Sequence, residues 1–213
     1  MKFNKIIRGN NREVNTTEEM YAVLDANFLC HISFLYNGKP HCIPTAFGRK
    51  GDTIYIHGST KNHMLNQLIS NDEVCITVTH LDGVVLAQTL FNTAANYRSA
   101  VVYGKALVVP QENDEFLEGL KVITDHIIKG RWDEVYLGTT SQLKATMLLK
   151  IPINSASVKI RRGDPQGDEN DYSNQWSGYI PLQLKALEPV EDLKFKKRHP
   201  LPKSVIDFTN REF

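Results

Sequence analysis

The pair Asn37-Gly38 constrains the fold of this chain more than any other feature of its sequence. It stands between two runs of alternating apolar and polar residues, "FLCHISFLY" at 28–36 and "HCIPTAFG" at 41–48. Asn-Gly between such runs favours a β-hairpin, because both residues adopt the positive φ angles that a two-residue turn requires. "GRKGD" then leads into a third run, "TIYIH" at 53–57. The sequence therefore predicts a three-stranded meander.

Strand-like patterns continue beyond this meander. They occupy residues 73–81, 83–91 and 95–109, with Asp82-Gly83 and the polar "NTAAN" between them. Six strands with one short inserted helix favour a barrel, so we expect a β-rich domain, mainly β with flanking helices, built as a six-stranded barrel. The strand pattern returns in "ATMLLKIPINSASVKIRR" at 145–162 and in "QWSGYIPL" at 175–182, the expected final strand.

Helical signals occur in three places. Thr16 and Glu19 form a capping box before an amphipathic run, and apolar residues recur at helical spacing over 59–70. "QENDEFLEGLKVITDHIIKG" at 111–130 is expected to form a helix of about four turns. After the polar loop at 163–174, the chain from Gln183 is rich in Lys and Pro. We expect a domain of residues 1–182 and an extension, 183–213, that drapes over the surface or over a partner subunit.

The composition gives no general attraction to polyanions. The 213 residues carry a formal net charge of +1, so any anion site must be local. The basic run "KFKKRH" at 194–199 is short and typical of a solvated surface, so we expect no nucleic acid and no membrane as partner. No apolar stretch approaches the roughly 20 residues that span a bilayer. The first residues lack the apolar segment of a signal peptide, so we expect a cytoplasmic protein.

The cysteines are odd in number and widely spaced, and each lies in an apolar, strand-like run: Cys30, Cys42 and Cys75. This pattern favours reduced thiols in the core over a disulfide framework or a zinc site. The following histidines lack the spacing of metal ligands: His31, His41, His80 and His126. We expect no metal site.

The segment "IYIHGSTKNHMLNQL", residues 54–68, changes from a strand pattern to a helix pattern within a few residues. The change runs through small and hydroxylated residues, Gly58, Ser59 and Thr60. A strand that turns into a helix in this way leaves backbone N–H groups directed at open space, and such corners often hold an anion. We therefore expect a ligand with an anionic group here.

Five segments, in chain order, carry a family resemblance: "IYIHGSTKNHML", "VCITVTHLDGVVLAQTLFNTAANYRSAVVYGKA", "GRW", "ATMLLKIPINSASVKIRRGDP" and "WSGYIPL". Together they resemble the flavin-nucleotide-binding branch of the pyridoxamine 5′-phosphate oxidase-like proteins, which includes the nitroimidazole resistance reductases. The resemblance covers residues 12–182. It implies a six-stranded split β-barrel of the FMN-binding type. It also implies a homodimer with FMN, or alternatively FAD, in two clefts at the subunit interface.

The resemblance also implies where the flavin lies. The strand at 43–45 would run beside the isoalloxazine ring, and the corner at 56–59 would hold the ring edge and the ribityl chain. Many relatives bind the 5′-phosphate with an Arg-Lys pair on the next turn, where this chain has His63 and Met64. The implied cofactor-binding residues are Ile43, Pro44, Thr45, Ile56, His57, Gly58, Ser59, Lys61, His63, Met64, Asn96, Tyr97, Arg98, Ser99 and Trp176.

Four of the singled-out residues have alternative roles. His57 either contacts the cofactor or satisfies local backbone groups. Arg98 needs either a phosphate or a buried carboxylate as partner, and we favour the phosphate. Trp176 either lies near the flavin of the partner subunit or belongs to the core. For Trp132, just past a helix, packing is the preferred role.

Two functions of different classes follow. The first is an FMN-dependent oxidoreductase, a reductase or oxidase of a small molecule such as a quinone or a nitro compound, with NADH or NADPH as a transient donor. No Gly-rich dinucleotide fingerprint follows a strand, so a tightly held nicotinamide cofactor is not expected. No Arg-x-His pair follows Trp176, which argues against true pyridoxamine 5′-phosphate oxidation. The second is a non-catalytic protein that binds or sequesters flavin or haem.

Overall fold

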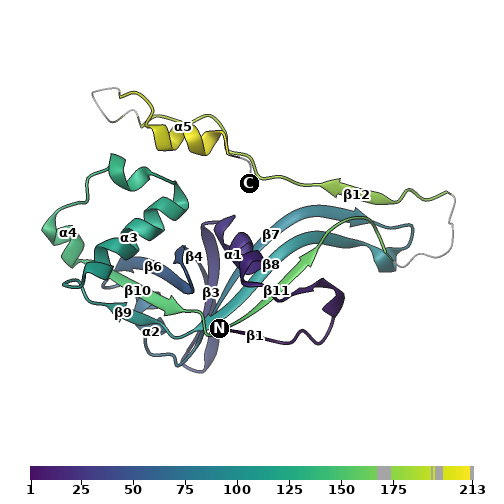
Figure 1. The fold of residues 1–213 in the computed structure, drawn as a ribbon, viewed down its shortest axis with the longest axis horizontal. Coiled ribbons are helices and arrows are strands. Elements are labelled where there is room, and N and C mark those ends of the chain that lie inside the picture. The colour runs from purple at the N-terminus through teal and green to yellow at the C-terminus, as the bar shows by residue number, and fades with distance from the viewer. Residues whose placement is uncertain (167–173, 193, 195–198, 212–213) are drawn as a thin grey trace.

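The computed structural model describes residues 1–166, 174–192, 194 and 199–211 of the chain. These residues are mainly β with a few helices, and their strands lie in two sheets (Figure 1). The larger sheet has the order β1-β11-β8-β7-β3-β4, with β2 beside β11 and β12 beside β7. Its strands are β1 (Lys2–Phe3), β2 (Glu13–Val14), β3 (Leu29–Tyr36), β4 (Lys39–Ala46), β7 (Val74–Leu86), β8 (Ala94–Gly104), β11 (Ser155–Arg161) and β12 (Gly178–Pro181).

The smaller sheet has the order β5-β6-β10-β9. Its strands are β5 (Gly48–Lys50), β6 (Thr53–Ser59), β9 (Leu107–Val109) and β10 (Thr146–Pro152). The α-helices are α1 (Thr17–Asp25), α2 (His63–Leu68), α3 (Asp114–Ile127), α4 (Thr140–Lys144) and α5 (Lys203–Thr209). The short 3₁₀ helices are η1 (Asn10–Arg12), η2 (Leu90–Asn92) and η3 (Arg131–Glu134).

The predicted hairpin is confirmed. Asn37 and Gly38 have φ angles of 51° and 71°, and β3 pairs with β4 in unbroken antiparallel register. The third strand of the predicted meander takes a different place, since β6 pairs with β5 and β10 in the smaller sheet and not with β4. β4 therefore forms an open edge of the larger sheet.

One apolar core lies between the two sheets. Inward-facing side chains from both sheets, such as Ile32, Ile54 and Ile76, are completely buried. Complete burial of a side chain of this size stabilises the fold by about 1.5–3 kcal/mol. Helices α1 and α2 contribute to the same core, and the predicted cap of α1 is present, because Thr16 Oγ1 accepts the Glu19 N–H at 3.4 Å.

The predicted four-turn helix is confirmed as α3, and it covers the outer face of the smaller sheet. Its residues Phe116 and Ile123 form a second apolar cluster with Leu148 of β10. The helix approaches the sheet closely at Gly48, where a Cβ atom would lie 2.6 Å from Ile123 Cα. A larger residue at this position would push the helix away from the sheet.

The two sheets are joined where β10 leads into β11. Ile153 N–H donates to the Asp52 carbonyl at 2.7 Å, beside the smaller sheet, and Asn154 N–H donates to the Tyr103 carbonyl at 2.8 Å in the larger sheet. Gly104 lies against this join, since a Cβ atom on it would stand 2.1 Å from the Pro152 oxygen. The absence of a side chain at Gly104 therefore permits the join.

Two predicted boundaries are wrong, and one run with a strand pattern is divided between the sheets. Asp82-Gly83 does not separate two strands, because β7 continues through it as one strand of 13 residues with a register shift at this point. The run at 145–162 is two strands that belong to different sheets. The helix expected from residue 59 begins at His63, because β6 continues to Ser59.

The mainly β class is confirmed, and two open sheets around one core agree with a split barrel. The expected number of six strands is not confirmed, because the described residues form twelve. The additional strands are mostly short edge strands of two to four residues, which carry little periodic signal in a sequence.

The core assignment of the cysteines holds for Cys30 only. Cys30 is buried, whereas Cys42 is exposed on the edge strand β4 and Cys75 is half-buried, and all three thiols are free. Within the described ranges, no group of three or more His, Cys, Asp or Glu side chains could hold a metal ion. No helix in this part of the chain is long and apolar enough to cross a membrane.

The C-terminal region contains a helix that the sequence does not predict. After β12 the chain runs along one side of the molecule toward α5 (Figure 1). Ser204 at the start of α5 donates its N–H to Glu134 Oε1 of η3 at 3.0 Å. Residues 167–173 of the predicted polar loop and residues 195–198 of the basic run lie outside the described residues.

Candidate functional site

The corner predicted between strand and helix exists at the end of β6, and main-chain bonds fix it. Thr60 N–H donates to the Ala145 carbonyl at 2.9 Å, and Asn62 N–H donates to the Ser59 carbonyl at 2.8 Å. Asn62 Oδ1 accepts the Leu65 N–H at 3.1 Å and so caps α2. Gly58 lies close to this helix, since a Cβ atom on it would stand 3.0 Å from Leu65 Cδ1.

The exposed residues of the corner are His57, Ser59, Thr60, Lys61 and His63. The His63 ring packs edge-on against Tyr36, with 4.7 Å between ring centroids, which brings the β3–β4 hairpin beside the corner. Neither Lys61 nor His63 forms an ion pair with a carboxylate among the described residues. Ile56 and Met64 belong to the core, so only their backbone groups face this corner.

The strand expected beside the flavin ring is the open edge β4. Ile43 packs against the core, and Pro44 and Thr45 continue the strand. Among the described strands β4 pairs only with β3, so every second residue along it directs its backbone polar groups outward, although Pro40 and Pro44 have no N–H to offer. An open edge of this kind can hydrogen-bond the polar edge of a planar ligand.

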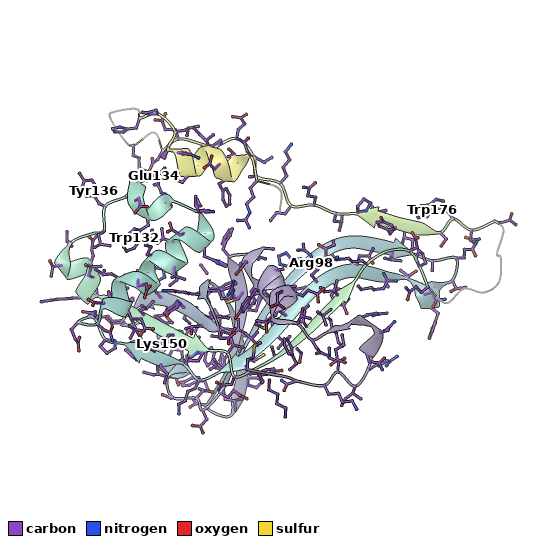
Figure 2. The ribbon with its side chains drawn as sticks, in the orientation of Figure 1. Arg98, Trp132, Glu134, Tyr136, Lys150 and Trp176 are labelled. Atoms are coloured by element: carbon purple, nitrogen blue, oxygen red, sulfur yellow. The ribbon has the colours of Figure 1, made fainter. Side chains whose placement is uncertain are left out.

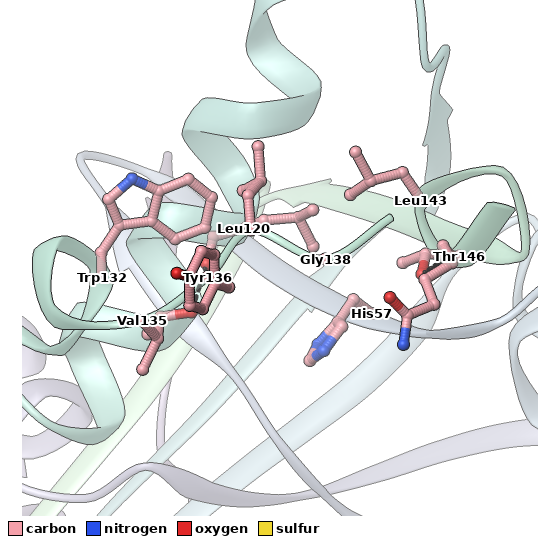
Figure 3. A pocket seen from close by; sticks show the side chains of 11 residues that line it. His57, Leu120, Trp132, Val135, Tyr136, Gly138, Leu143 and Thr146 are labelled. Atoms are coloured by element: carbon pink, nitrogen blue, oxygen red, sulfur yellow. Dashed lines mark hydrogen bonds between the residues drawn. The ribbon is translucent and has the colours of Figure 1, made fainter. Parts of the chain in front are cut away.

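A cavity of about 400 Å³ lies on the side of β6 away from the core (Figure 3). His57 and Thr146 line it from neighbouring strands, and α3, η3, α4 and the segment between them supply the remaining wall. Figure 3 shows Trp132 and Tyr136 across the cavity from His57. The further side chains around it are mostly apolar: Leu120, Val135, Leu137 and Leu143.

His57 is exposed as a residue, but the part of its imidazole that the surrounding protein covers loses water, and this burial lowers the pKa of His57 below the usual 6.5. The imidazole is therefore neutral at pH 7, which is the form that ligates metals. No hydrogen bond connects His57 to another described side chain. A ring nitrogen of His57 is accordingly available to a ligand in the cavity.

Ion pairs hold α3, one wall of this cavity, against the smaller sheet. Glu115 on α3 accepts a hydrogen bond from the Tyr55 hydroxyl at 3.0 Å and one from Lys150 Nζ at 2.6 Å. The Lys150 ammonium lowers the pKa of the Glu115 carboxyl, and burial raises the pKa of Tyr55 to about 12. These contacts fix the distance between α3 and the strand that carries His57.

Arg98 pairs with a carboxylate, which was one of the two partners expected for it. Its guanidinium donates from Nε to Asp82 Oδ2 at 2.9 Å and from Nη2 to Asp82 Oδ1 at 2.8 Å. Asp82 is in β7, at the register shift that breaks the ladder beside β8. The bidentate pair occupies the Nε–Nη2 edge of the guanidinium, through which Arg98 could otherwise bind a phosphate.

The neighbours of Arg98 on β8 separate by alternation to the two faces of the larger sheet. Tyr97 and Ser99 lie on the outer face, away from the core. Asn96 is buried, and its Oδ1 accepts a hydrogen bond from Arg161 Nη1 at 2.6 Å. None of these side chains reaches the β6–α2 corner of the same chain.

Trp176 is not a core residue, since 66% of its surface is exposed. Its indole packs over Gly178 just before β12. Figure 2 shows it at the opposite end of the molecule from Trp132 and Tyr136. A contact between Trp176 and the corner of its own chain is excluded by this placement, and the contact with a partner's ligand stays a prediction.

Within one chain the structure brings together part of the implied set. The β6–α2 corner and the β3–β4 hairpin adjoin, whereas residues 96–99 and Trp176 lie elsewhere. Sequence reasoning missed the cavity beside His57, because most of its wall comes from residues 132–146, which show no strong periodicity. The "GRW" segment was the one signal in this region, and Trp132 both packs against the second cluster and lines the cavity.

Comparison with known proteins identifies related sequences and folds. The model of the family described as pyridoxamine 5′-phosphate oxidase matches residues 16–160. Among curated proteins, no sequence matches the chain. The flavocytochrome Anf3 from Azotobacter vinelandii is 32% identical, with a TM-score of 0.87 over 95% of this chain and 94% of that chain.

Two further solved structures are similar. The FAD and heme binding protein from Mycobacterium smegmatis is 32% identical, with a TM-score of 0.87 over 93% of this chain and 97% of that chain. A candidate 5-nitroimidazole antibiotic resistance protein from Bacteroides thetaiotaomicron has a TM-score of 0.59 over 70% of this chain and 86% of that chain. The latter is 20% identical, so that likeness supports the fold alone.

The lowered pKa of His57 predicts a specific pH dependence of stability. Below pH 6.5 the folded state binds fewer protons at His57 than the unfolded state does. The contribution of His57 to the free energy of unfolding is therefore fully present above pH 6.5 and is lost as the pH falls. We expect the free energy of unfolding to fall less between pH 7 and pH 5 in His57→Gln than in the native chain. Urea titrations at several pH values measure this. His80 and His126, whose pKa values are also lowered by burial, remain in the variant, so the difference isolates His57.

Proposed function

The chain belongs to the pyridoxamine 5′-phosphate oxidase family, and on this premise we propose that it is a flavin-dependent oxidoreductase. The observation that carries the proposal is the β6–α2 corner, which lies within the matched residues. There Lys61 and His63 present donors without a carboxylate partner among the described residues, and small residues let a ligand approach the backbone. These donors suit the phosphate on the ribityl chain of a flavin nucleotide. The open edge of β4 beside them suits the polar edge of the flavin ring.

FMN and FAD share the ring, the ribityl chain and the first phosphate, so both fit this arrangement. FMN was the flavin expected from the sequence, while two relatives at 32% identity are described as a flavocytochrome and as an FAD and heme binding protein. A bound flavin supplies hydride and electron transfer. The residues of the chain bind its phosphate at the corner, orient the ring along β4 and limit the access of water. The substrate class is a small acceptor such as a quinone or a nitro compound, with NADH or NADPH as a donor.

We propose that the protein is a homodimer that joins through the outer face of the larger sheet. Tyr97, Val101 and Tyr103 on this face are only half-buried, and none of the helices formed by the described residues covers them. The segment after β12 also exposes apolar side chains, with Leu187 at 79% and Val190 at 96%. Both surfaces favour burial against a second copy.

The dimer is tested by sedimentation equilibrium of the purified chain. We expect twice the monomer mass at micromolar concentration. Val101→Glu, which puts a charge at the centre of the outer face, is expected to shift the equilibrium toward the monomer by at least about tenfold in Kd. A native chain that sediments as a monomer would contradict this proposal.

The flavin proposal is tested by the spectrum of the purified protein and by mass identification of what it releases on denaturation. We expect FMN or FAD, reduced by NADH or NADPH without oxygen and reoxidised by a quinone or a nitro compound. His63→Arg should strengthen charge-assisted bonding to the phosphate, so FMN affinity should rise relative to riboflavin. A flavin that no donor reduces would favour the binding protein over the enzyme, and the absence of flavin affinity would refute both.

The cavity beside His57 favours haem as a second ligand, and we propose His57 as its ligand. The neutral imidazole of His57 faces a cavity lined by Trp132, Tyr136 and Leu143, which is an apolar and aromatic environment. Haem iron in proteins is commonly held by histidine in such surroundings. The two relatives at 32% identity, whose descriptions name a flavocytochrome and a heme binding protein, support the same proposal.

Haem binding is tested by reconstituting the full chain with haemin and recording the Soret band. We expect His57→Ala to lose the band shift and most of the affinity, because the iron loses its protein ligand, while flavin content stays unchanged. His31→Ala, on the exposed face of the larger sheet, is the matched control and should retain haem. Equal spectra of the native chain and His57→Ala would contradict the assignment of the ligand.

A further inference from the structure

A second cavity, of about 470 Å³, lies at the end of the core. Among the described residues, none lines both this cavity and the one beside His57. Figure 2 shows Arg98, which lines the second cavity, apart from Trp132 and Tyr136, which line the other. The second cavity is enclosed by residues 26–29 between α1 and β3, residues 79–82 and 98 of the larger sheet, and residues 182–184 after β12.

Polar side chains replace apolar ones where the core ends. Val78 of β7 and Ala100 of β8 are buried on the inner face of the larger sheet. Strand alternation directs His80 and Arg98, each two positions away from these residues, to the same face. The two stand opposite each other in the register of β7 and β8, and Asp82 lies at the register shift beside them. The ionisable side chains of the cavity therefore come from one place on the sheet.

Apolar side chains come from all three parts of the wall, among them Phe28, Leu81 and Leu184. The segment after β12 is held against the sheet by a main-chain bond, since Leu182 N–H donates to the Asp82 carbonyl at 3.0 Å. Sites for small molecules are typically apolar cavities of this size with a few placed polar groups. A compound that fits this cavity has an apolar body and a polar group directed at the sheet.

Arg98 and Asp82 neutralise each other but leave one nitrogen of the guanidinium unused. Arg98 bonds to the carboxylate through Nε and Nη2. Its Nη1 donates to no described residue. The two side chains are only 23% and 27% exposed, and together they carry no net charge. The pair therefore favours a neutral ligand over an anion, and Nη1 is available as a donor to a neutral oxygen atom.

His80 supplies the complementary acceptor. Its Nε2 lies 2.9 Å from the Val23 carbonyl oxygen of α1. A carbonyl oxygen can only accept, so Nε2 carries the proton and Nδ1 of the neutral ring is an acceptor. Burial, with the charge of Arg98 as a smaller cause, lowers the pKa of His80 and keeps the ring neutral at pH 7. Nδ1 forms no hydrogen bond with a described residue.

One hydroxyl group satisfies both free positions. Its oxygen accepts from Arg98 Nη1, and its proton is donated to His80 Nδ1. A carboxylate has no proton for Nδ1 and would be repelled by the charge of Asp82. An aromatic ring that carries the hydroxyl packs well against apolar side chains such as Phe28. We propose that this cavity binds a phenol, a neutral aromatic compound with a hydroxyl group. The inference does not depend on flavin or haem, because both are proposed to bind elsewhere in the chain.

Calorimetry on the purified full chain at pH 7 tests the ligand class with naphthol, its methyl ether and naphthoate. The three share one ring system, but the ether has no proton to donate and naphthoate carries a charge. We expect naphthol to bind at one site per chain, and the ether and naphthoate to bind at least about tenfold more weakly. A native chain that does not bind naphthol, or that binds the other two compounds as tightly, would overturn the inference.

Two conservative variants test the place of binding. His80→Gln retains a donor for the Val23 carbonyl but removes the Nδ1 acceptor, so naphthol should weaken about tenfold while the ether is unchanged. Arg98→Lys retains the charge beside Asp82 but removes Nη1, so both compounds should weaken. His31→Gln, on the outer face of the larger sheet, is the matched control and should change neither. Naphthol binding that is unchanged in both variants lies elsewhere and refutes the site, and the comparison of compounds on the native chain holds even if a variant does not fold.

Discussion

The join between β10 and β11 is the constraint on which the rest of the structure depends. At this point one continuous segment leaves the smaller sheet and enters the larger, bonded to the Asp52 carbonyl on one side and to the Tyr103 carbonyl on the other. Gly104 makes the crossing possible, because any side chain there would collide with the Pro152 carbonyl. Both sheets are thereby held on opposite sides of one core, and each sheet has a second face that is directed away from this core.

The two outer faces are used differently. On the smaller sheet, α3 is fixed by Glu115 to Tyr55 and Lys150, and the segment that follows it closes the cavity beside His57. No helix like α3 covers the outer face of the larger sheet in the described part of the chain, and this face carries half-buried polar and aromatic side chains. The first arrangement makes a site within one chain. The second is the face through which we propose that two copies of the chain join.

The cationic side chains also divide into two groups. Arg98 is matched by Asp82, and Lys150 by Glu115, so both hold the fold together. Lys61 at the corner and Lys159 and Arg161 near the N-terminal segment have no carboxylate partner in the described part of the chain. A nearly neutral chain that leaves these few cations unmatched concentrates its anion affinity at particular places, which is how a net charge of +1 is compatible with binding a phosphorylated cofactor.

The sequence by itself determined the elements whose signals are local. Asn37-Gly38 gave the hairpin its turn, Thr16 and Glu19 capped α1, and the apolar spacing at 111–130 specified α3, because φ preferences, caps and periodicity act over a few neighbouring residues. The strand-to-helix corner and its small residues were readable for the same reason. The mainly β class followed from these elements together.

Only the tertiary structure decided which distant residues meet. Asp82 was expected to mark a turn, yet it lies within β7, where Arg98 on the neighbouring strand pairs with it. His57 was placed by the pleat of β6 in a cavity whose opposite wall is formed about 80 residues later, and the run at 145–162 was divided because its halves pair with different sheets. Partner choice between strands and the matching of charges depend on contacts that are remote in the chain, and no local pattern of residues encodes them.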